Sequence, residues 1–149
     1  MPVFALDGVR VRPWTAGREV AGIGLSDESI FVNESEYLQK VAGVGKFYAY
    51  DGRYVEYFSE EGSDPEWVRL YLNGQVLVAL LHQRRIINFH ASSFIHNGRG
   101  VMILGETGAG KSSVTLAFAL QVGGFLTDDI TPVVFVDKVP HIMPLNRKV

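Results

Sequence analysis

The most restrictive feature of the chain is a glycine-rich stretch with fixed spacing, GETGAGKS, at residues 105–112. Gly105, Gly110, Lys111 and Ser112 satisfy the pattern G-x-x-x-x-G-K-[ST]. Its glycines let the backbone curl until successive N–H groups converge on phosphate oxygens, and a helix that begins there directs its positive dipole end at the same point. Such a loop requires a strand before it and a helix after it.

Both flanks of the loop have the required patterns. GVMIL, which ends at Leu104, predicts a strand, and SSVTLAFALQV predicts a helix that Gly123-Gly124 ends. Upstream, IINFHASSFI predicts a strand that turns at Asn97-Gly98, so it forms a hairpin with the strand of the loop. Counting outward from that turn places Ile95 near Gly100 and His90 near Gly105.

Downstream of the predicted helix, FLTDD predicts a short strand that ends in Asp128 and Asp129, and we expect it to lie beside the strand of the loop. ITPVVFV and VPHIM then form a hairpin with Asp137-Lys138 as its turn. Adjacent strand residues point to opposite faces, so the two aspartates can take two roles, one on Mg²⁺ and one on an incoming hydroxyl. The alternative is a solvated Asp-Asp turn.

The first 63 residues predict a β-rich portion. KFYAYDGRYVEYF has Asp51-Gly52 between two alternating aromatic arms, which favours a hairpin with a type I′ turn. Its Tyr and Phe stripe is either a ring-stacking surface or a half-buried sheet face, and the second interpretation is favoured. Asp64 and Pro65 then predict a helix start, and Asn73-Gly74 predicts a kink or a restart. The apolar stripe expected to face a core consists of Trp67, Leu70, Tyr71, Leu77, Val78 and Leu81.

Composition excludes several classes. The 149 residues carry a formal net charge of −2 without a basic block, so we expect no nucleic-acid partner. Cysteine is absent, which excludes disulfides. The sequence has no apolar run long enough to predict a membrane span. We expect a soluble, cytoplasmic protein with residues 1–63 and 64–149 as its two portions, or else one compact domain.

The loop predicts the contacts of a nucleoside triphosphate with Mg²⁺. Lys111 reaches the β- and γ-phosphates, and the Ser112 hydroxyl is a hard oxygen ligand for the metal. The predicted nucleotide-binding residues are Gly105, Glu106, Thr107, Gly108, Ala109, Gly110, Lys111, Ser112 and Ser113.

The segment FHASSFIHNGRGVMILGETGAGKSSVTLAFALQVGGFLTDDITPV resembles the catalytic core of HPr kinase/phosphorylase and its shorter stand-alone relatives, over roughly residues 86–136. The resemblance implies an α/β fold with a P-loop core related to phosphoenolpyruvate carboxykinase, preceded by the β-rich portion. It also implies roles: His90 as the active-site histidine, Asp128 as the base for a serine hydroxyl and Asp129 as the Mg²⁺ carboxylate. Such relatives continue past the last hairpin, so we expect a truncated or a naturally short chain.

The expected function is that of an ATP- and Mg²⁺-dependent kinase, with His90, Lys111 and Asp128 as catalytic residues and Ser112 and Asp129 as metal ligands. By resemblance its substrate is the serine, or another hydroxyl, of a protein or peptide, and we expect no membrane partner; a homo-oligomer is compatible with the sequence. Two alternatives remain open, a non-catalytic ATP-sensing module and a small-molecule kinase. His82, His96 and His141 have no assigned role.

Overall fold

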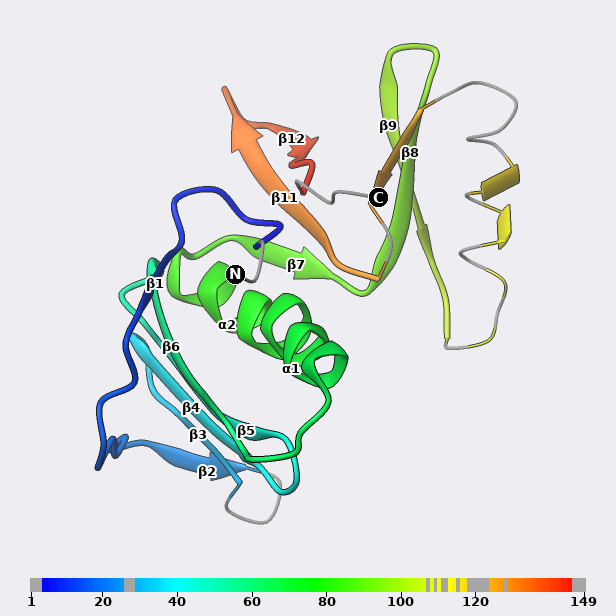
Figure 1. Cartoon of the computed structure of the whole chain (residues 1–149). Helices are drawn as coiled ribbons and strands as arrows, with labels where there is room; N and C mark the ends of the chain where they lie inside the picture. The colour runs from blue at the N-terminus through cyan, green and yellow to red at the C-terminus, as the bar shows by residue number, and fades with distance from the viewer. Residues whose placement is uncertain are drawn as a thin grey trace. The chain divides into compact units, whose positions relative to one another are not determined.

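The computed structural model describes residues 4–25, 29–106, 108, 110, 113–114, 116–117, 124–127 and 129–145. It divides into two compact units, the first ending at Arg85 and the second spanning Ile86–Leu145 (Figure 1). The sequence analysis assigned residues 64–85 to the second portion. In the structure they belong to the first unit, because their helices pack against its sheet.

The first unit is built on a six-stranded sheet in the order β1-β6-β5-β4-β3-β2. β1 runs parallel to β6, and the other neighbours pair antiparallel. The strands are β1 (Arg10–Arg12), β2 (Ile23–Leu25), β3 (Ile30–Val32), β4 (Glu36–Val41), β5 (Gly45–Tyr50) and β6 (Tyr54–Ser59).

The predicted turn between β5 and β6 is confirmed. Asp51 and Gly52 have φ values of 55° and 64°, and the Arg53 N–H donates to the Tyr50 carbonyl at 3.2 Å, as a type I′ turn requires. The Gly52 N–H donates to Gln83 Oε1 at 2.9 Å, and its carbonyl accepts from Arg84 Nε at 2.5 Å. These two bonds join the turn to the end of the helical segment.

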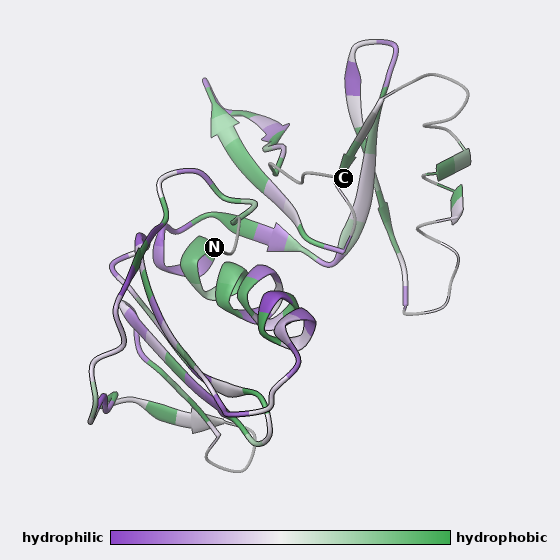
Figure 2. Cartoon of the chain, viewed as in Figure 1, coloured by the Kyte–Doolittle hydropathy of each residue, from purple (hydrophilic) through white to green (hydrophobic). Residues whose placement is uncertain are grey.

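The helical segment consists of α1 (Pro65–Tyr71), the π-helical turn η1 (Leu72–Val76) and α2 (Leu77–Gln83). Asp64 caps it as predicted, because its side chain accepts from the Glu66 N–H at 2.9 Å. Asn73-Gly74 lies within η1, so the helix passes through a wider turn there and is not broken. α2 is hydrophobic over most of its length (Figure 2).

The apolar stripe predicted for this helix was partly wrong. The residues that face the sheet include the row Val68, Leu72 and Val76, together with the fully buried Leu77, Leu80 and Leu81. Trp67 and Leu70 are 52% and 61% exposed. A helix turns by ~100° per residue, so these two side chains lie off the buried row even though they are large and apolar.

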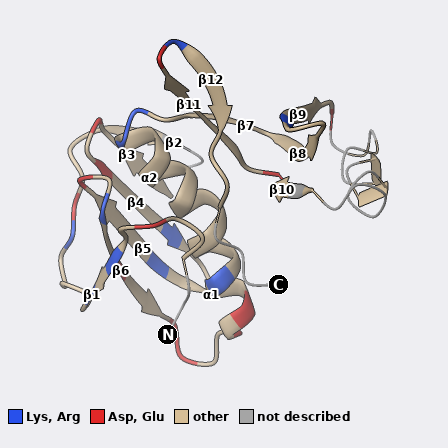
Figure 3. Ribbon diagram, turned by 90° about the horizontal axis from the view of Figure 1, so that it is seen from above, with Lys and Arg blue, Asp and Glu red and all other residues tan. Residues whose placement is uncertain are grey.

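The aromatic stripe of β5 and β6 fills sheet faces, which confirms the favoured interpretation. Phe47 is fully buried on the helix side and stacks on Tyr71 with ring centroids 5.6 Å apart. On the opposite face, the Arg12 guanidinium lies 3.7 Å from the centroid of the Tyr54 ring. Positive and negative side chains are interspersed along the strands of this unit (Figure 3).

Glu56, on the same face as Tyr54, is 1% exposed and anchors the segment that precedes β2. Its carboxylate forms an ion pair with Arg18 and accepts from the Thr15 N–H at 2.7 Å. Burial alone would raise the pKa of Glu56, but the hydrogen bonds from Arg18 and Thr15 outweigh it, and the pKa lies below its ordinary value of 4.5.

The second unit contains two three-stranded sheets, in the orders β10-β8-β9 and β12-β11-β7. All pairs in them are antiparallel. The turns predicted at Asn97-Gly98 and Asp137-Lys138 are confirmed, because all four residues have positive φ. The strands are β7 (Ile87–Phe89), β8 (Ala91–His96), β9 (Arg99–Leu104), β10 (Phe125–Thr127), β11 (Thr131–Val136) and β12 (Val139–Ile142).

The predicted α/β fold class is wrong. Among the described residues, strands account for 42% and helix for 18%, and the strands form three sheets. An α/β fold needs helices that cross between parallel strands, whereas tight turns connect most strands here and give antiparallel hairpins. The helical segment of residues 65–83 covers the first sheet and does not serve as a crossover in the second unit.

Within the described part of the chain, no helix has the length and hydropathy that a membrane crossing requires.

Glu56→Gln tests the electrostatic anchor. Because the folded-state pKa lies below the ordinary value, ionised Glu56 stabilises the fold above pH 4.5, and this contribution is lost as the pH falls through the folded-state pKa. We expect the variant to lose about 1–3 kcal/mol of unfolding free energy at pH 7 and to lose less than wild type on acidification below pH 4.5. Urea unfolding at both pH values measures this. An unchanged stability at pH 7 would contradict the assigned anchor.

Candidate functional site

β8 is the central strand of its sheet and sets the position of the predicted site residues. Ile95 pairs with Gly100, as the sequence predicts, and Ala91 pairs with Leu104. His90 directly precedes Ala91 in the chain, and Gly105 directly follows Leu104. The first residue of the glycine loop and His90 therefore lie at the same end of the hairpin, away from the turn at Asn97-Gly98.

β10 pairs with the other edge of β8, with Thr127 opposite Ser93. The expectation that it lies beside the strand of the loop is therefore wrong, since β8 separates β10 from β9. β9 and β10 both run antiparallel to β8, so they point in the same direction. The segment after Thr127 consequently starts at the end of the sheet where the glycine loop starts.

A corner connects the two sheets at this end. Phe89 on β7 pairs with Thr131 on β11, and Ser93 on β8 pairs with Thr127 on β10, so Thr127 and Thr131 both lie alongside the segment from Phe89 to Ser93. His90 and Asp129 are both exposed. Asp129 has a φ of 64°, a left-handed conformation that is unusual for a residue other than glycine.

Three buried hydroxyl groups connect the strands around this corner. Ser93 Oγ and Thr127 Oγ1 lie 2.5 Å apart, and Thr127 Oγ1 lies 2.6 Å from Thr131 Oγ1. Thr131 in turn donates to the Ala91 carbonyl at 2.7 Å. All four residues have zero exposure. The sequence analysis missed these hydroxyls, because Thr and Ser within strands are common and give no signal of mutual contact.

Two glycines in the described part of the glycine loop have a left-handed backbone. Gly108 and Gly110 have φ values of 85° and 89°, and nothing lies within 4 Å of a Cβ built on either one. Glycine is therefore required there for its conformation and not for space. The Val114 N–H donates to the Gly110 carbonyl at 3.0 Å, and Ser113 and Val114 are helical.

Five predicted site residues lie outside the described residues: Thr107, Ala109, Lys111, Ser112 and Asp128. Gly105, Glu106 and Gly108 are described and exposed. No group of three or more His, Asp or Glu side chains suited to a metal occurs among the described residues. Of the predicted site at this end of the sheet, the structure therefore describes His90, Asp129 and part of the loop backbone.

One buried polar atom near the corner has no partner. Asn88 Oδ1 forms no hydrogen bond within the described structure. Asn88 lies on β7 two residues before His90, opposite Pro132, which has no N–H to donate.

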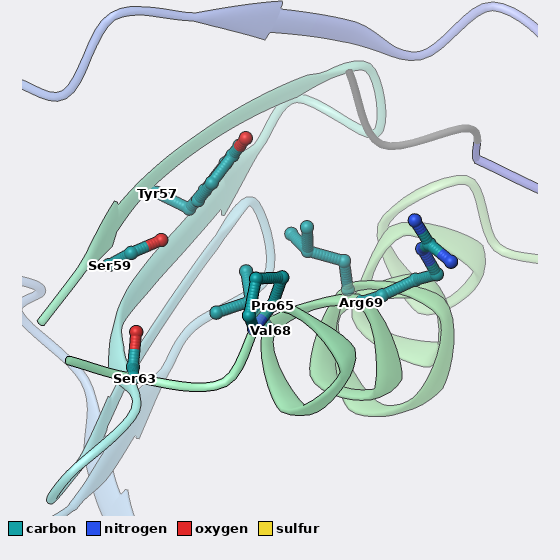
Figure 4. A pocket seen from close by; sticks show the side chains of 7 residues that line it. Tyr57, Ser59, Ser63, Pro65, Val68 and Arg69 are labelled. Carbon is teal, nitrogen blue, oxygen red and sulfur yellow. The ribbon is translucent and has the colours of Figure 1, made fainter.

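A cavity of 240 Å³ lies in the first unit, between the end of β6 and α1. Tyr57, Ser59 and Ser63 place hydroxyl groups on one side, and Val68 and Arg69 line it from the helix (Figure 4). None of the predicted catalytic, nucleotide-binding or metal-binding residues lines it.

Comparison of this chain with models of protein families, with curated proteins and with solved structures found no match.

Proposed function

We propose that the chain binds ATP with Mg²⁺ through the loop of residues 105–113 and transfers the γ-phosphate to a hydroxyl group. One observation supports this most strongly. The pairing of β8 with β9 and β10 brings His90, Gly105 and the segment that contains Asp129 to one end of a sheet. Phosphoryl transfer needs a phosphate-binding loop and a carboxylate for the metal or the acceptor in one place, and an imidazole there can donate to a phosphate oxygen.

The loop supplies phosphate binding. It follows directly on β9, its glycines at 108 and 110 have positive φ, and the Val114 N–H donates to the Gly110 carbonyl. Backbone N–H groups in such a curl favour anions, and the motif adds Lys111 as the cation for the β- and γ-phosphates. In this proposal the predicted loop residues, from Gly105 to Ser113, hold the nucleotide.

Asp129 and the Ser112 hydroxyl would hold Mg²⁺, because hard oxygen donors suit this ion. The exposed Asp129 carboxylate follows β10, whose end lies at the same end of the sheet as the loop, which fits such a role. Bound there, Mg²⁺ would neutralise the negative charge that develops on the phosphates. His90 would donate to a phosphate oxygen or orient Asp128, which accepts the proton of the attacking hydroxyl.

The identity of the acceptor rests on the resemblance to HPr kinase-like proteins, whose acceptor is a serine of a protein or peptide. A module that binds ATP without transferring phosphate would use the same loop. The two functions differ in whether the γ-phosphate leaves the nucleotide, and incubation of the chain with γ-labelled ATP and serine-containing peptides separates them.

Lys111→Ala tests the loop. The substitution removes the cation for the β- and γ-phosphates, so we expect ATP affinity to fall by roughly tenfold or more and any transfer to stop. Calorimetry with Mg·ATP measures the affinity. Lys46→Ala is the matched control, because Lys46 is exposed on β5 in the other unit and its loss should change nothing. A folded Lys111→Ala chain with wild-type affinity would refute the assignment of the loop.

The two aspartates should separate metal binding from turnover. Asn tolerates the left-handed region, so Asp129→Asn removes charge while keeping the backbone, and we expect it to lose the Mg²⁺-dependent part of ATP affinity. Asp128→Asn should keep that affinity and lose turnover. Asp137→Asn is the control, since Asp137 is exposed and has a positive φ of 50°. Equal loss of Mg·ATP affinity in the Asp128 and Asp129 variants would contradict these separate roles.

A further inference from the structure

We infer that the buried hydroxyls of Ser93, Thr127 and Thr131 form a directed hydrogen-bond chain that positions Asp129 for the metal. The role of Asp129 as a metal ligand rests on the proposed function. The effect of the hydrogen-bond chain on the backbone of the corner does not depend on it. The three residues are positioning residues, since all of them are buried and Asp129 is exposed.

The direction of the chain follows from the number of protons available. Each hydroxyl has one proton to donate. Thr131 donates its proton to the Ala91 carbonyl, so the contact with Thr127 requires Thr127 to donate to Thr131. The contact of Thr127 with Ser93 then requires Ser93 to donate to Thr127. The order is therefore Ser93 to Thr127 to Thr131 to the backbone of Ala91.

The chain spans the strained corner on both sides. Thr127 precedes Asp129 by two residues and Thr131 follows it by two, and the 2.6 Å contact between their hydroxyls fixes the separation of the two strand ends. A left-handed φ at a residue other than glycine is unfavourable and persists only when its surroundings impose it. The strand ends on both sides of Asp129 are fixed, and they hold Asp129 in this conformation.

The last acceptor places the corner against the start of β8, directly after His90. Thr131 donates to the carbonyl of Ala91, the residue directly after His90, across a separation of 40 positions in sequence. Because all three hydroxyls are excluded from water, loss of the Thr127 or Thr131 hydroxyl leaves another buried group unpaired, and water does not replace it. The position of Asp129 relative to β8 therefore depends on the complete chain.

Thr131→Val tests the inference, because valine has nearly the shape of threonine without the hydroxyl. Two measurements are made on the full chain: the NMR chemical shifts of Asp129 and Ile130 without nucleotide, and the ATP affinity by calorimetry with and without Mg²⁺. We expect the shifts to change, and the Mg²⁺-dependent affinity to fall by about tenfold, as is usual when a group that orients a metal ligand is lost. The affinity without Mg²⁺ should stay at the wild-type value, which a general loss of folding would not allow.

Thr131→Ser is the matched control, since it keeps the hydroxyl and should retain wild-type values in both measurements. A folded Thr131→Val chain with wild-type Asp129 shifts and wild-type Mg²⁺-dependent affinity would overturn the inference. If the wild-type protein showed no Mg²⁺-dependent affinity for ATP, the proposed function would be overturned instead. The NMR shifts alone would then decide whether the hydrogen-bond chain fixes the backbone at Asp129.

If Thr131→Val does not fold, Ser93→Ala takes its place. It removes the first donor and leaves no other donor without an acceptor, so the fold should be retained. We expect smaller changes in the same direction in both measurements. Wild-type shifts and wild-type Mg²⁺-dependent affinity in a folded Ser93→Ala chain would overturn the inference.

Discussion

The arrangement of the candidate site depends on the antiparallel pairing of β8 with two strands at once. The tight turn at Asn97-Gly98 fixes the register of β9 on one edge, and the contact of Thr127 with Ser93 fixes β10 on the other. Because both neighbours run opposite to β8, their ends meet where β8 begins. His90, the start of the glycine loop and Asp129 are thereby brought to one end of the sheet although 39 positions separate His90 from Asp129.

The same pairing explains why the corner needs buried polar groups. β7 and β8 are nearly continuous, yet they pair with different strands, β11 and β10, and the chain bends at His90 and again at Asp129. Bends interrupt the ladder of backbone hydrogen bonds, and buried carbonyls there need other donors. The hydroxyl of Thr131 supplies one for Ala91, and the strand alternation that buries Thr131 also places it against Thr127.

Local features of this fold were predictable from sequence, and its long-range arrangement was only partly so. Asp51-Gly52, Asn97-Gly98 and the Asp64 cap were predicted correctly, because each depends on a few adjacent residues. The α/β fold class and the neighbour of β10 were wrong, since a glycine loop between a strand and a helix does not determine how the remaining strands pair. The hydroxyl chain gave no signal, as its members lie 34 and 4 positions apart and only the fold joins them.

The central claim is that a bound nucleotide's metal lies at the His90 end of β8. Mn²⁺ in place of Mg²⁺ tests it, because its unpaired electrons broaden nearby NMR signals and the effect falls steeply with distance. β8 has six residues, so its two ends lie ~20 Å apart. With Mn·ATP, the account predicts strong broadening at His90, Gly105 and Ile130 and little at Asn97 and Gly98. Broadening centred on the Asn97-Gly98 turn, or in the first unit, would contradict it.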